Sequence, residues 1–66
     1  MKYPVWHNDA NEKVTCIEKI KVMEQGMEEL AQMAEDLLVD GILMGISRQQ
    51  LQNSLMQLIQ NLKGEL

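Results

Sequence analysis

Apolar residues recur along the middle of the chain at alternating spacings of three and four. Counting in sevens, one register holds Cys16, Met23, Leu30, Leu37 and Met44, and the other holds Ile20, Met27, Ala34 and Gly41. This alternation is typical of an α-helix that packs lengthwise against other helices. It predicts a long first helix with a packing seam for a partner, formed by Ile17, Ile20, Met23, Met27, Leu30, Ala34 and Leu37.

Residues that favour helix ends suggest where this helix begins and stops. The tetrapeptide Asp9-Ala10-Asn11-Glu12 has the form of a capping box, an acceptor followed three residues later by glutamate. Gly45 suits the left-handed conformation that closes many helices. We therefore predict a helix over about residues 10–44. The heptad passes through Gly26 without a phase change, whereas Gly41 is a weaker point at which the helix could unwind early.

A shorter helix is expected after the turn at residues 45–47. Ser47 and Gln50 form a second capping box, and the leucines from Leu51 onward keep one apolar face to about residue 62. The fold class is therefore all-α, a helical hairpin over residues 9–66 that follows an extended arm at residues 1–8. Leu37 to Met44 are apolar on nearly every side of the first helix, so we expect the centre of the core there.

The two predicted helices differ in length, and the difference has a consequence. A helix of about 34 residues spans about 50 Å, and one of about 15 residues spans about 23 Å. The short helix can therefore cover only about half of the long one. An uncovered apolar seam favours association, so we expect a homodimer in which antiparallel long helices cover each other in a four-helix bundle.

The arm carries the only two aromatic residues, Tyr3 and Trp6. Burial of an aromatic ring stabilises a small fold strongly, so both side chains are expected to cover the exposed end of the seam. A short linear motif that docks on a partner protein is the alternative.

Composition narrows the possible partners. The chain has 66 residues, six Lys and Arg, ten Asp and Glu, and a net charge of −4. Nucleic-acid affinity comes largely from basic side chains on phosphates, so this balance favours neither nucleic acid nor an anionic membrane. The longest apolar stretch is about ten residues, too short to cross a bilayer. A single cysteine and the absence of an export signal predict a cytoplasmic protein.

Side chains suited to catalysis or metal binding are few. Cys16 is the single thiol and His7 the single imidazole, so neither a disulfide nor a four-ligand zinc site is expected. No cofactor, metal or enzymatic activity is predicted. The carboxylates instead form a stripe facing away from the seam, an acidic surface that could meet a basic protein: Glu28, Glu29, Glu35 and Asp36.

One segment resembles a known motif. Gly45-Ile46-Ser47-Arg48-Gln49-Gln50-Leu51 is similar to the turn and the start of the recognition helix in helix-turn-helix DNA-binding proteins. The resemblance implies a small transcriptional regulator that uses residues 45–55. Arg48 is the only basic residue of that segment, and the acidic stripe comes before it. The leading interpretation is therefore a small, acidic, non-enzymatic protein-interaction module that binds itself and another protein, as an adaptor, assembly factor or inhibitor.

Overall fold

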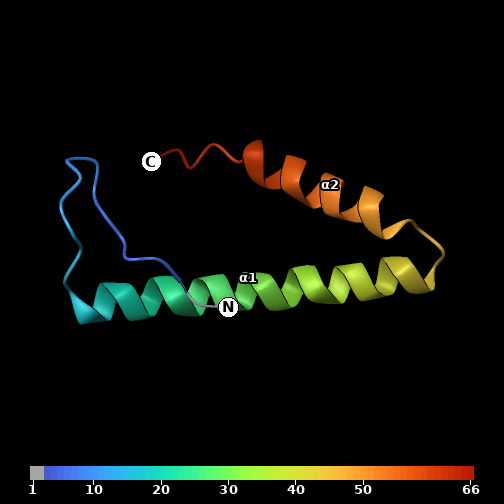
Figure 1. Cartoon of the computed structure of the whole chain (residues 1–66), viewed down its shortest axis with the longest axis horizontal. Coiled ribbons are helices and arrows are strands. Elements are labelled where there is room, and N and C mark those ends of the chain that lie inside the picture. Colours follow the sequence, from blue (N-terminus) through green and yellow to red (C-terminus); the bar gives the residue numbers. More distant parts are fainter. Residues whose placement is uncertain (1–2) are drawn as a thin grey trace. The chain divides into compact units, whose positions relative to one another are not determined.

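The computed structural model describes residues 3–66, which contain two helices and no strand. Helix α1 spans Ile17–Leu43, and helix α2 spans Arg48–Gln60 (Figure 1). The predicted all-α class with one long and one shorter helix is confirmed. The chain divides into two compact units, Met1–Ala31 and Gln32–Leu66, and α1 contributes residues to both. Each unit is described in turn.

The first unit begins with a small hairpin rather than a plain extended arm. His7 and Lys13 form an antiparallel bridge, the Asn8 N–H donates to the Glu12 carbonyl at 2.9 Å, and the Val14 N–H donates to the Trp6 carbonyl at 2.8 Å. The turn between the two segments is closed by the Asn11 N–H, which donates to the Asn8 carbonyl at 2.9 Å. Hairpins with three-residue loops commonly combine such a turn with a residue in the left-handed region. Asn11, with φ 61°, is that residue.

The hairpin occupies the residues where the sequence predicted the first helix to begin, so the predicted start near Ala10 is wrong. The capping box predicted that the Asp9 side chain accepts a backbone hydrogen bond, but the Asn8 side chain is the acceptor. Its Oδ1 accepts hydrogen bonds from the Ala10 N–H at 3.0 Å and the Glu12 N–H at 2.9 Å. An asparagine that bonds backbone groups downstream favours a turn over a helix. The first backbone bond into α1 instead runs from the Ile20 N–H to the Cys16 carbonyl, at 3.1 Å.

Helix α1 continues without interruption through both Gly26 and Gly41. It ends in a Schellman motif, in which the Ile46 N–H donates to the Gly41 carbonyl at 2.9 Å and the Gly45 N–H donates to the Ile42 carbonyl at 3.0 Å. Gly45 has φ 89°, so the predicted left-handed helix end is confirmed.

Helix α2 begins where the sequence placed it. The Ser47 hydroxyl accepts from the Gln50 N–H at 3.3 Å and caps the helix. The helix ends at Gln60, two residues before the predicted end, and the Asn61 N–H makes the last bond of this ladder to the Gln57 carbonyl at 3.0 Å.

Within the second unit, α2 meets the C-terminal part of α1 at Gly41, which is buried. A Cβ at this position would lie 2.7 Å from Leu51 Cδ1, so the absence of a side chain lets Leu51 reach the backbone of α1. Leu38 and Ile42 on α1 and Leu55 on α2 are half-buried. This contact positions α2 through small and branched apolar groups.

The expectation that residues 37–44 form the centre of a closed core is wrong for the single chain. Leu43 is 80% exposed and Met44 is 72% exposed. Among the residues that the structure describes, no hydrophobic side chain is buried. Only one side of this part of α1 is covered by its own chain, and the other apolar sides face outward.

Candidate partner-binding surface

The predicted seam separates into two rows with different surroundings. We call Ile20, Met27, Ala34 and Gly41 the covered row, because the first three are half-buried and Gly41 is buried. We call Met23, Leu30 and Leu37 the open row, because their side chains are 48%, 46% and 51% exposed. The rows lie on adjacent faces of one helix, since each repeats every seven residues. Ile17, at the start of α1, is exposed as well.

The two rows differ in exposure because other parts of the chain lie against the covered row in each unit. In the second unit, Leu51 contacts Gly41 of the covered row. In the first unit, Ile20 of the covered row lines a hollow together with Trp6 and Val14 of the hairpin. Met23 also lines this hollow and is still about half exposed. The open row therefore keeps apolar surface that could be buried by another helix.

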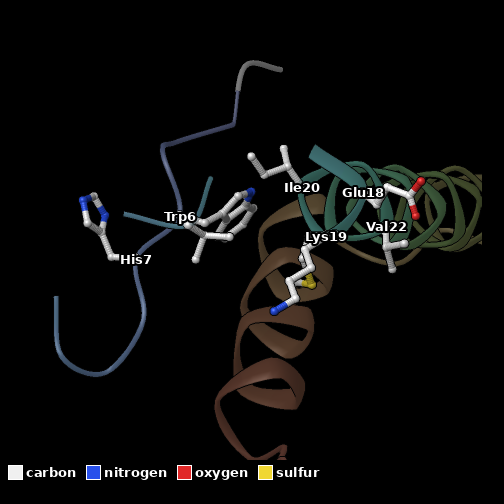
Figure 2. Close-up of a pocket in the computed structure, with 8 residues that line it drawn as sticks. Trp6, His7, Glu18, Lys19, Ile20 and Val22 are labelled. Atoms are coloured by element: carbon white, nitrogen blue, oxygen red, sulfur yellow. The ribbon is translucent and has the colours of Figure 1, made fainter. Parts of the chain in front are cut away.

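The hollow of the first unit lies between the hairpin and the first two turns of α1, and has a volume of about 540 Å³. Figure 2 shows the Trp6 ring extending toward Ile20, and His7 of the hairpin also lines the hollow. Glu18, Lys19 and Val22 complete the lining on the helix side. The sequence predicted that Trp6 would lie against the seam but did not identify the contribution of Val14, which follows from the hairpin.

The indole Nε1 of Trp6 is buried without a hydrogen-bond partner in the described part of the chain. It points toward the apolar side chain of Ile20 (Figure 2). A buried N–H that loses its water partners and gains none costs about 1–3 kcal/mol. Trp6 is held against α1 by its ring surface and not by its polar atom. Tyr3, the other aromatic residue of the arm, is half-buried.

All four residues of the predicted acidic surface are exposed on α1, namely Glu28, Glu29, Glu35 and Asp36. One of them makes a local contact, since the Gln32 amide donates to the Asp36 carboxylate at 2.9 Å. None is held in a cleft with another predicted site residue. The arrangement is that of a solvated helix face, available to a basic surface on another molecule.

Helix α2 presents a largely uncharged outer face. Gln49 donates to Asn53 at 3.1 Å across one turn, and both residues are exposed. Met56 and Ile59 on the same helix are also exposed. The segment with helix-turn-helix resemblance therefore consists of the glycine turn, the Ser47 cap and an α2 surface on which Arg48 is the only base.

Groups with intrinsic reactivity are sparse in the described residues. Cys16 is an exposed free thiol just before α1. No group of three or more His, Cys, Asp or Glu side chains in residues 3–66 is placed to hold a metal ion. Neither described helix combines the length and apolar character that crossing a bilayer requires.

Comparison of the chain with protein-family models, with curated proteins and with solved structures gives no match.

Proposed function

We propose that this chain is a protein-interaction module that self-associates through the open row of α1 and binds a second protein as an adaptor, assembly factor or inhibitor. The smallest assembly consistent with two helices per chain is a homodimer that forms a four-helix bundle. The observation that supports this proposal is the exposure of Met23, Leu30 and Leu37 at seven-residue spacing on one helix.

The energetic reason is the small amount of apolar surface that the chain covers by itself. Sixteen large hydrophobic side chains are exposed in the described residues, and none is buried. Each Å² of apolar surface removed from water contributes roughly 25 cal/mol. Short chains that bury little surface commonly gain stability from a partner subunit. A second copy on the open row would supply that burial at the most regular apolar surface of the molecule.

A second protein would then meet the surfaces that self-association leaves exposed. The acidic surface on α1 suits a basic patch, and the contacts would weaken with salt. The uncharged face of α2, with Met56 and Ile59 among Gln and Asn side chains, suits an amphipathic helix. Both surfaces consist of exposed residues on helices, which suits recognition of another protein.

The mass of the purified chain in solution tests the first part of the proposal. Sedimentation equilibrium over a hundredfold range of concentration should give twice the chain mass at the upper end, with a concentration-dependent melting temperature. A monomer at all concentrations would overturn self-association. Titration with nonspecific duplex DNA at two salt concentrations tests the regulator alternative: salt-sensitive binding would favour it, because phosphate contacts release counterions.

A further inference from the structure

We propose that the occupant of the open row is a second copy of this chain running antiparallel, with Lys19 of each copy beside Asp40 of the other. This inference rests on the proposed self-association, keeps the antiparallel orientation expected from the helix lengths, and adds the charged pair that selects it. It follows from the position of the open row within α1 and from the order of charges along the helix.

The open row is symmetric about the midpoint of α1. Leu30 is the central residue of the 27 in Ile17–Leu43, and Met23 and Leu37 lie seven residues on either side of it. A two-fold axis passing near Leu30 would therefore place Met23 of one copy against Leu37 of the other. Interfaces between identical chains in a two-fold dimer are self-complementary in this way. Met23 and Leu37 are 14 residues apart, so the paired part of the open row would span about 21 Å.

The charges along α1 are not symmetric, and this selects the orientation. Its first two turns contain Lys19, Lys21 and one acid, Glu18, and its last turn contains no base. From Glu24 to Asp40 every charged residue is acidic. The helix dipole is positive at the N-terminal end and negative at the C-terminal end, so acids near the C-terminal end are unfavourable in a single helix. Antiparallel pairing places the basic end of one copy beside the acidic end of the other. Parallel pairing would place the two basic ends side by side and the two acidic ends side by side.

Lys19 and Asp40 stand out among these charges because they flank the open row. They are 21 residues apart, three heptads, so they lie on the same side of α1 as the exposed Met33 and as Gly26. A Cβ at Gly26 would meet nothing within 4 Å, so this side of the helix is open at its middle, whereas Lys19 also lines the hollow beside the hairpin. In an antiparallel pair centred on Leu30, Lys19 of one copy falls within about one helical turn of Asp40 of the other. The contact occurs twice by symmetry.

Charge reversal tests this pair. Lys19→Glu and Asp40→Lys should each raise the dimer dissociation constant about tenfold, because two attractions per dimer become repulsions. The double variant should return within about threefold of the original value, since the pair is restored with exchanged signs. The matched control is Lys21→Glu with Glu35→Lys. These residues are two heptads apart on the opposite side of α1, and their reversal should change the constant less than threefold.

The native thiol gives an independent measure of orientation. In the antiparallel pair the two copies of Cys16 lie about 40 Å apart, whereas in a parallel pair they would be adjacent. Under mild oxidation the original chain should therefore form no disulfide faster than a denatured control. The Met44→Cys variant should form a disulfide-linked dimer between residue 16 of one copy and residue 44 of the other.

The possible results separate the two proposals. Rapid Cys16–Cys16 linkage in a chain of dimeric mass would overturn the antiparallel orientation and leave self-association intact. A dimer whose affinity is not restored in the double charge-reversed variant would exclude the Lys19–Asp40 pair. A monomeric mass at all concentrations would overturn self-association, and the orientation with it.

Discussion

Leu51 lies directly over Gly41, with its Cδ1 atom 2.7 Å from the place that a Cβ of residue 41 would occupy. Leu51 Cδ2 lies 2.9 Å and Leu51 Cγ 3.3 Å from that place. The packing of the second unit therefore depends on the absence of a side chain at Gly41 of α1 and on the branched side chain of Leu51 of α2, which fills the space.

Replacement of the two glycines within α1 by alanine should separate helix propensity from packing. Gly26→Ala should stabilise the chain by about 1 kcal/mol, because alanine favours helix and a Cβ there meets nothing within 4 Å. Gly41→Ala gains the same propensity but displaces Leu51, which costs about 1–3 kcal/mol. Thermal unfolding at equal chain concentration should place Gly41→Ala below Gly26→Ala. Equal stabilisation would mean that Leu51 moves away without cost.

The hairpin of the first unit should depend on two asparagines in different ways. Asn8→Ala removes the acceptor of two backbone N–H bonds and should destabilise the hairpin by about 1 kcal/mol. Asn11 has φ 61°, so Asn11→Gly should be tolerated, whereas Asn11→Val should cost about 1–2 kcal/mol. Hydrogen exchange at the Val14 amide, which donates to the Trp6 carbonyl, measures these effects. Equal protection in the Gly and Val variants would contradict the left-handed turn.

Trp6 should stabilise the first unit through its ring, not through its N–H. Trp6→Phe keeps an aromatic surface beside Ile20 and removes the unpaired donor, so the hairpin should be at least as stable as before. Trp6→Ala should lose about 1–3 kcal/mol, because Ile20 and Val14 lose their apolar neighbour. Ring-current shifts of the Ile20 methyl groups in NMR spectra report the contact. A larger loss in Trp6→Phe than in Trp6→Ala would show that the indole N–H has a partner.

The helical parts of the fold were largely predictable from sequence because their signals are local. The heptad identifies α1, and the Gly45 turn and the Ser47 cap identify the beginning of α2 within a residue. The beginning of α1 was missed because two local signals compete near Asp9. A capping box and an asparagine turn use similar residues, and the choice depends on whether Asn8 bonds the N–H groups of Ala10 and Glu12.

The candidate surface was only partly predictable. Periodicity alone assigned Ile20 and Met23 to one seam, since both are apolar at helical spacing. Which row the chain itself covers depends on Trp6 and Leu51, residues distant in sequence from those they cover. The β-branched Val14 and Thr15 were a sign that the arm extends beyond residue 8. The apolar run at 37–44 predicted burial, whereas Leu43 and Met44 are exposed in the single chain.

Comparison of the variants Leu37→Asp and Leu51→Asp should distinguish effects on association from effects on folding. Leu51 is half-buried against Gly41, so Leu51→Asp places a charge at the contact between the helices and should cost about 2–4 kcal/mol, with loss of helical circular dichroism. Leu37 is 51% exposed, so Leu37→Asp should retain most of the helical signal in dilute solution and raise the dimer dissociation constant at least about a hundredfold. Sedimentation and circular dichroism on the same samples provide both measurements, and Glu35→Lys, on the solvated face, should alter neither. A dimeric mass for Leu37→Asp would remove the open row from the interface, because a buried carboxylate without a partner cannot be accommodated there at low cost.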